Sequence, residues 1–133
     1  MNAATGELCA DDVMARTFVA VAPEDTLGEM AEKMAGVDAG SVLVVEFGCL
    51  TGILTSRDVM CAIGERVHPS EARVRDWMTA EPVTARPDTS TDEAARLMVA
   101  GGFHHLPMVE DQRPIGVVGL RATLGTLQHG SGW

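Results

Sequence analysis

The stretch Leu50-Thr51-Gly52-Ile53-Leu54-Thr55-Ser56-Arg57-Asp58 carries the clearest structural signal in the chain. The short apolar run at residues 52–54 indicates a buried strand. Thr55, with Asp58 three residues later, has the pattern of a capping box at the start of a helix. The stretch therefore predicts a strand that runs directly into a helix.

The start of this helix also suits a ligand. Its first N–H groups are unpaired and carry a partial positive charge, which favours phosphate or another anion, and Arg57 adds a full charge beside them. Ionised Asp58 only accepts hydrogen bonds, which suits the two hydroxyls of a ribose, and the Thr55 hydroxyl can donate or accept next to it. Alternatively, Thr55 and Asp58 only cap the helix and Arg57 is solvated. The stretch alone leaves both interpretations open.

Composition narrows the class of protein. A chain of 133 residues can form one domain or two very small ones that share a core. Hydrophobic residues make up 46% and aromatic residues 4%, which predicts a compact core of Val, Leu, Ala and Met. A net charge of −9 without a Lys/Arg cluster argues against nucleic acid and anionic membranes as partners, although a small anion in a basic pocket is compatible with it.

The cellular location is predicted from the absence of a membrane-span pattern, a secretory-leader pattern and a disulfide pattern in the sequence. No apolar run approaches the roughly 18 residues of a membrane span, and the first ten residues do not resemble a secretory leader. The three cysteines do not have the spacing of a zinc site or a disulfide framework. We therefore expect reduced thiols in a cytoplasmic protein.

Helix and strand signals follow one another in a regular order through the first half. They predict a helical turn, a strand, a helix, two strands joined by a turn, and a second helix, at residues 11–16, 17–21, 26–36, 41–46, 50–54 and 56–64. The continuous apolar run at 41–46 is typical of a strand covered on both faces. The polar stretch at 65–72 is interpreted as a linker.

The second half repeats the first at a constant offset of 64 residues, without a gap. The matched positions include helix starts, hairpins and chain breakers: Met14 with Met78, Pro23 with Pro87, Thr26 and Glu29 with Ser90 and Glu93, Val45 with Val109, Gly52 with Gly116, and Arg57 with Arg121. This pattern indicates an internal duplication, with repeats at 8–65 and 66–133 and the linker at 65–72. Each repeat is too small to bury its apolar faces alone, so we expect the two to pack together.

The two repeats differ at the strand-to-helix corner. Gly119 stands at the position of Thr55, and Ala122 stands at the position of Asp58. Glycine can partly replace threonine as a helix cap, but neither Gly119 nor Ala122 can hold a diol. Only the first corner therefore keeps the groups expected to bind a ribose.

In its order of motifs the sequence resembles a tandem pair of CBS domains, the family named after cystathionine β-synthase, arranged as a Bateman module. Matching motifs in the two halves carry the likeness: Asp12-Val13-Met14 with Asp76-Trp77-Met78, Pro23-Glu24-Asp25-Thr26 with Pro87-Asp88-Thr89-Ser90, Gly40-Ser41-Val42-Leu43-Val44-Val45 with His104-His105-Leu106-Pro107-Met108-Val109, and the corner at 52–58. The resemblance covers roughly residues 8–128. Order, spacing and duplication together make it specific, although no single motif does.

The resemblance implies a mixed α/β (α+β) fold of two pseudo-symmetric β-α-β-β-α repeats that pack through their sheets and leave two clefts. Members of this family commonly bind adenosine-containing ligands there, such as AMP, ADP, ATP or S-adenosylmethionine. They usually act as sensors and often form homodimers.

Carried onto this sequence, the resemblance places a nucleotide in the cleft that contains Asp58. Asp58 would take the ribose hydroxyls, with Thr55 beside it and Arg57 assisting. The other repeat would complete the cleft, with one strand meeting the base and two basic residues near phosphate: Glu81, Pro82 and Val83, and His104 and Arg121. The opposite cleft would contain Gly119 and Ala122, so we expect one competent site per chain.

Metal binding and catalysis find little support. The neighbours His104 and His105 would point to opposite faces of a strand and cannot chelate one ion without help. The sequence contains no Walker loop, no Gly-x-Ser-x-Gly elbow and no His-Glu-x-x-His helix. We therefore expect neither a metal site nor enzyme activity.

Together these observations predict a stand-alone regulatory protein that senses an adenosine-containing nucleotide between its repeats. A homodimer and an unidentified protein partner are expected with it. The alternative is an interaction or oligomerisation module that binds no small molecule, in which the first corner is only a capped helix.

Overall fold

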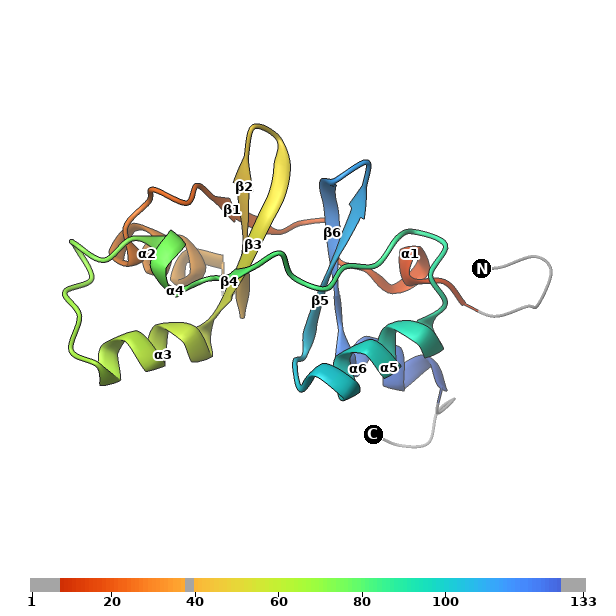
Figure 1. The fold of residues 1–133 in the computed structure, drawn as a ribbon. Helices are drawn as coiled ribbons and strands as arrows, with labels where there is room; N and C mark the ends of the chain where they lie inside the picture. Colours follow the sequence, from red (N-terminus) through yellow and green to blue (C-terminus); the bar gives the residue numbers. More distant parts are fainter. Residues whose placement is uncertain (1–7, 38–39, 128–133) are drawn as a thin grey trace. The chain divides into compact units, whose positions relative to one another are not determined.

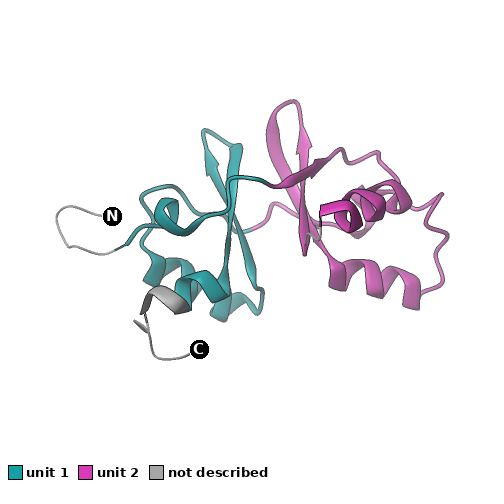
Figure 2. Ribbon diagram, turned by 180° about the vertical axis from the view of Figure 1, so that it is seen from behind, with its two compact units in different colours: residues 1–17, 83–133 teal, residues 18–82 magenta. Residues whose placement is uncertain are grey.

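The computed structural model describes residues 8–37 and 40–127, which form two compact units. Unit 2 is Phe18–Pro82, and unit 1 combines Val83–Trp133 with Met1–Thr17 (Figure 2). In chain order the elements are α1 (Ala10–Val13), β1 (Val19–Val21), α2 (Leu27–Val37), β2 (Ser41–Glu46), β3 (Cys49–Thr55), α3 (Ser56–Gly64), α4 (Val74–Trp77), β4 (Thr79–Ala80), α5 (Thr91–Gly101), β5 (His105–Glu110), β6 (Arg113–Gly119) and α6 (Leu120–Leu127) (Figure 1). Among the described residues, no helix has the length and apolar character needed to cross a membrane.

Unit 2 is built on a four-stranded sheet in the order β1-β2-β3-β4. β1 pairs with β2 in parallel, and the other pairs are antiparallel. The centre of β2, residues 42–44, is fully buried, as its continuous apolar run predicts. The helices add apolar side chains to the same core, namely Leu27, Met30 and Met34 from α2, Ala62 from α3 and Val74 from α4.

Unit 1 repeats this layout around the β5–β6 hairpin. Single bridges take the place of the outer strands, because Ala85 pairs with Met108 in parallel and Ala15 pairs with Val117 antiparallel. Its core is formed by small and apolar residues, namely Ala10, Met14, Ala85, Ala94, Met98, Leu106, Met108 and Val118. The predicted mixed α and β fold class is confirmed.

Each unit combines most of one sequence repeat with the first segment of the other repeat. In unit 1 the Thr91 N–H donates to the Leu8 carbonyl, and in unit 2 the Leu27 N–H donates to the Ala72 carbonyl, both at 3.0 Å. These bonds lie at equivalent positions, since 8 and 72, and 27 and 91, are each 64 residues apart. The sequence repeats and the compact units are therefore different divisions of the chain.

A methionine from each of these segments lies against a glycine of the neighbouring hairpin. A Cβ atom built on Gly116 would be 2.6 Å from the Met14 sulfur, and one built on Gly52 would be 2.6 Å from the Met78 sulfur. No side chain fits there unless a neighbour moves, so both close approaches require glycine.

Most predicted elements are found close to their expected bounds, and the helix predicted at 56–64 is α3. The strand expected at 17–21 is shorter, since only Val19–Val21 finds a partner on β2. The turn expected at 11–16 is α1, Ala10–Val13. The linker at 65–72 contains no helix or strand, but the Gly28 N–H donates to its Pro69 carbonyl at 3.0 Å, so it helps to cap α2.

The two hairpins share one turn geometry. Two residues form each turn, and both have positive φ: Phe47 (55°) and Gly48 (78°) between β2 and β3, and Asp111 (52°) and Gln112 (68°) between β5 and β6. Positive φ at both central positions defines the type I′ turn, whose twist matches that of the strands. The register also shifts at equivalent places, after Val44 and after Met108, so the duplication extends to irregular details.

Candidate functional site

The corner between β3 and α3 is a complete capping box. The Thr55 N–H donates to Asp58 Oδ2 at 2.8 Å, and the Thr55 hydroxyl donates to the same oxygen at 3.1 Å. In return the Asp58 N–H donates to Thr55 Oγ1 at 3.4 Å. The extended backbone of Thr55 (φ −112°, ψ 168°) turns β3 into the helix. The capping role of both residues, one of the two interpretations from sequence, is therefore present.

Capping does not use the whole carboxylate of Asp58. Only Oδ2 takes hydrogen bonds from the described residues, and the side chain is half-buried. The two bonds from Thr55 fix the orientation of the carboxylate, which leaves Oδ1 as an oriented acceptor. A helix cap and an acceptor for a ligand hydroxyl are thus compatible in one side chain.

The loop before β2 lies next to this corner. The Ser56 N–H donates to the Gly40 carbonyl at 3.2 Å, so one of the first N–H groups of α3 is occupied. Arg57 follows and is exposed, and no carboxylate within residues 8–37 and 40–127 forms an ion pair with it. Its guanidinium is available to an anion near the helix start.

The strand expected at Glu81, Pro82 and Val83 is wrong, because the strand here is β4 at Thr79–Ala80, and Glu81 and Pro82 follow it in the same unit. The Glu81 N–H donates to the Thr51 carbonyl at 3.1 Å, which continues the pairing of β4 with β3. Glu81 has a φ of 48°, an uncommon conformation for a residue other than glycine. Val83, the next predicted contact, is the first residue of unit 1 after this crossing and is half-exposed.

The second corner, between β6 and α6, has the same backbone geometry with different side chains. The Leu120 N–H donates to the His104 carbonyl at 2.9 Å, the counterpart of the bond from Ser56 to Gly40. His104 and Arg121 are both exposed at this end of unit 1. Ala122 offers no acceptor where Asp58 does in the first corner.

His105 lies on β5, paired with Gly119 of β6. Burial lowers the pKa of the His105 imidazole, and the neighbouring His104 lowers it further. Both effects favour the neutral form of the imidazole over the charged form. In the described part of the chain, no group of three or more His, Cys, Asp or Glu side chains could hold a metal ion.

The predicted site residues are thus divided between the two units. Thr55, Arg57, Asp58, Glu81 and Pro82 lie in unit 2, whereas Val83, His104 and Arg121 lie in unit 1. The structure brings Thr55 and Asp58 into contact with each other. The cleft expected from these residues stays a prediction.

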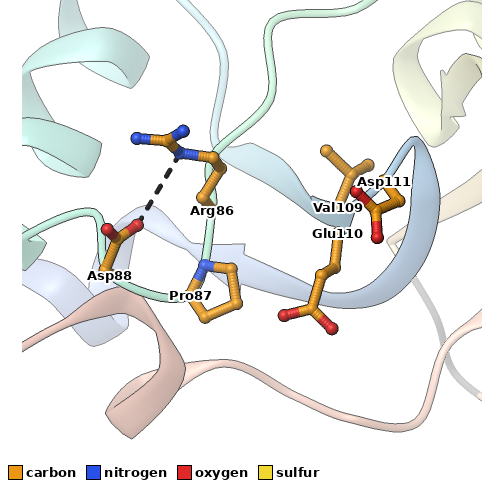
Figure 3. A pocket seen from close by; sticks show the side chains of 6 residues that line it. All are labelled: Arg86, Pro87, Asp88, Val109, Glu110 and Asp111. Carbon is orange, nitrogen blue, oxygen red and sulfur yellow. Dashed lines mark ion pairs between the residues drawn. The ribbon is translucent and has the colours of Figure 1, made fainter.

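Sequence reasoning did not predict a cavity of about 370 Å³ in unit 1. Figure 3 shows its lining, which combines the segment before α5 with the tip of the β5–β6 hairpin: Arg86, Pro87, Asp88, Val109, Glu110 and Asp111. The Arg86 guanidinium lies 3.7 Å from an Asp88 oxygen, and both side chains are largely exposed. The pairing of Ala85 with Met108 brings these segments together. No local sequence motif predicts such a long-range contact.

Comparison with known proteins identifies the architecture. The family description "CBS domain" matches residues 10–65 and 74–127. The CBS domain-containing protein YhcV of Bacillus subtilis is 31% identical over 109 residues, which cover 82% of this chain and 78% of that protein. Inosine-5'-monophosphate dehydrogenase of Methanocaldococcus jannaschii is 35% identical over 117 residues, which cover 86% of this chain but only 23% of the enzyme.

Solved structures show the same likeness. A CBS-domain-containing protein from Agrobacterium tumefaciens superimposes with a TM-score of 0.78 and 27% identity, over 87% of this chain and 96% of its own. CBSX2 in complex with AMP superimposes with a TM-score of 0.79 and 23% identity, over 91% of this chain and 97% of its own. The second of these likenesses concerns the fold alone.

Proposed function

This chain belongs to the CBS-domain family, and we propose that it is a regulatory module. In this proposal it binds an adenosine-containing nucleotide beside the corner at residues 55–58. The observation that carries the proposal is the carboxylate of Asp58, which two bonds from Thr55 hold in place while Oδ1 takes no bond from the described chain. An ionised carboxylate held in this way accepts hydrogen bonds from a ribose diol without further ordering.

The other predicted residues have secondary roles in this proposal. Arg57 stands at the N-terminus of α3, where a phosphate is favoured, and His104 and Arg121 would approach the phosphates from the other repeat. The backbone at Glu81, Pro82 and Val83 would meet the base. CBSX2, a structural neighbour, is solved with AMP, which supports AMP, ADP, ATP or another adenosyl compound as the ligand class.

Regulation would follow from linkage. A ligand that contacts both repeats favours the arrangement in which its contacts are correctly spaced, and it acts only through its different affinities for two arrangements. We infer no catalytic step, and the similarity to the dehydrogenase covers 23% of that enzyme. A homodimer is also proposed, supported by the apolar Met60 and Ile63, which are 71% and 60% exposed on α3.

The proposal is tested by thermal unfolding of the purified protein with AMP, ADP, ATP, NAD, S-adenosylmethionine and GTP, each in excess. A ligand at 100 times its Kd should stabilise the native state by about 2.7 kcal/mol, which raises Tm by several degrees. Asp58→Ala should abolish the shift because the diol loses its acceptor.

Glu29→Ala is the matched control for Asp58→Ala. Glu29 is also the third helical residue of a capping box, since its Oε1 accepts from the Thr26 N–H at 3.2 Å and its own N–H donates to Thr26 Oγ1 at 3.1 Å. Each variant should lower the free energy of unfolding by about 0.5–2 kcal/mol through loss of the cap. Only Asp58→Ala should remove the ligand-induced shift, and an equal shift in both variants would contradict the proposed site.

The second candidate function is an interaction module that binds no small molecule. The completed capping box favours it, because capping alone is a sufficient structural use for Thr55 and Asp58. In that case no nucleotide of the panel would shift Tm. Asp58→Ala and Glu29→Ala would then differ from the unmodified chain only in stability.

A further inference from the structure

The β2–β3 turn carries an aromatic residue, Phe47, which is exposed and has a positive φ. Phe47 is 96% exposed, the highest exposure among the large hydrophobic residues of the described chain, and its φ is 55°. Figure 1 shows the hairpin tip extending away from the helices of unit 2. A bulky residue at positive φ is a backbone outlier, and its exposed ring gains nothing from burial.

The second repeat provides an internal comparison for this position. Asp111 occupies the equivalent place in the β5–β6 turn with nearly the same φ, 52°. Asp and Asn tolerate the left-handed region because their short polar side chains bond locally, and they are preferred in type I′ turns. The turn itself therefore requires no aromatic residue, and an ordinary turn residue serves the same geometry elsewhere in this chain.

No packing against the described residues compensates for the conformation of Phe47. Only 4% of its surface is covered, and a Cβ atom added at the adjacent Gly48 would meet no atom within 4 Å. Residues held in sparsely populated conformations persist where the surrounding structure or a function demands them. Among the described residues nothing packs on the ring of Phe47, so this part of the fold gives no reason for an aromatic side chain here.

We propose that Phe47 is an anchor that inserts into an apolar pocket with a basic rim on a separate protein. Exposed aromatic side chains that become fully desolvated are typical energetic centres of protein interfaces. Glu46, which is also exposed, directly precedes Phe47, and the whole chain has a net charge of −9, so positive charge around the pocket would be complementary. The inference deepens the proposed regulatory role by naming the surface a partner contacts, and it requires no nucleotide.

Other occupants fit this surface less well. An anionic membrane would repel a chain of net charge −9, and one phenylalanine gives little insertion energy. On a second copy of the chain, Phe47 could enter the cavity at the β5–β6 tip. Three carboxylates and only one cation, Arg86, line that cavity, so its net negative charge would repel Glu46.

The first test compares Phe47→Asn with Asp111→Asn in thermal unfolding. Asn suits the left-handed conformation, so Phe47→Asn should raise Tm by about 2–5 °C. Asp111→Asn exchanges two residues that both tolerate this conformation and should leave Tm unchanged. A lower Tm for Phe47→Asn would show that the ring supports the fold, and it would overturn the proposal.

The second test places a photo-crosslinking phenylalanine analogue at position 47, or at position 111 as a control, in cells of the source organism. We expect one protein to be crosslinked from position 47 and not from 111. Its purified form should bind Phe47→Asn at least tenfold more weakly than the unmodified chain, bind Phe47→Leu with intermediate affinity, and bind Glu46→Lys more weakly at low salt.

Several results would overturn the inference. They are crosslinks within the chain or to a second copy, equal crosslinking from both positions, no crosslinked protein, or equal affinity of the partner for Phe47→Asn. The nucleotide-induced Tm shift should be unchanged in Phe47→Asn, because the substitution lies outside the corner at residues 55–58. A missing shift in the unmodified chain would count against the proposed nucleotide site and not against the anchor.

Discussion

Gly116→Ala tests whether the segment at residues 8–17 is an integral part of unit 1. The new Cβ atom would be 2.6 Å from the Met14 sulfur and 2.7 Å from the Ala15 carbonyl oxygen, and no real Cβ contact is that short. The thioether can rotate away, but the Ala15 backbone cannot move without a loss. Its N–H and carbonyl are both bonded to Val117, at 2.8 Å and 3.0 Å.

The magnitude follows from these two contacts. Inserting a methyl group into a packed site costs about 1–3 kcal/mol. Each of the two bonds between Ala15 and Val117 contributes about 0.5–1.5 kcal/mol if the segment detaches. We therefore expect the free energy of unfolding to fall by about 2–6 kcal/mol, with a corresponding fall in Tm.

The assay is urea unfolding combined with amide hydrogen exchange. Protection should fall at Ala15 and Val117, since both donate across this bridge. Gly36→Ala is the control, because a Cβ there meets no atom within 4 Å and alanine should stabilise α2 by up to about 1 kcal/mol. If Gly116→Ala unfolds like the unmodified chain and keeps its protection, the close packing of residues 8–17 on β6 is refuted.

Two further predictions concern packing and titration. Met14→Ala should destabilise by about 2–5 kcal/mol because the side chain is only 9% exposed, whereas Val99→Ala, at 66% exposure, should stay within about 0.5 kcal/mol; equal urea midpoints for the two variants would contradict the core assignment. For His105, the lowered pKa means that the unfolded chain binds more protons between the folded pKa and 6.5. Its contribution to stability is complete above pH 6.5 and is lost as the pH falls through the folded value. Tm measured from pH 8 to pH 5 should therefore fall less steeply in His105→Asn than in the unmodified chain, and parallel curves would exclude this role for His105.

Local signals predicted the elements of this fold well. Capping pairs mark the helix starts because their partners lie three residues apart, as with Thr26 and Glu29 or Thr55 and Asp58. The apolar run at 41–46 identified β2, because burial on both faces requires it. The duplication then transferred each of these assignments to the second half.

Contacts between distant segments were not predictable in this way. The packing of Met14 on Gly116 joins residues 102 positions apart, and no local pattern pairs one methionine with one glycine. The cavity at Pro87 and Val109 depends on the same kind of contact. At the candidate site, the residue types could be predicted from the sequence, but only the structure shows that Asp58 caps with one oxygen while the other takes no bond from the described residues.

The second corner shows that this helix start does not depend on a carboxylate at the position of Asp58. α6 begins at Leu120 and extends for eight residues although Ala122 stands at the position of Asp58, so the fold forms this helix start without a capping carboxylate. Its Leu120 N–H still finds the His104 carbonyl, as the Ser56 N–H finds Gly40 in the first corner. The bond common to both corners is therefore a backbone bond. The side chains of Thr55 and Asp58 have no counterpart in the second corner, and we propose that they bind a diol.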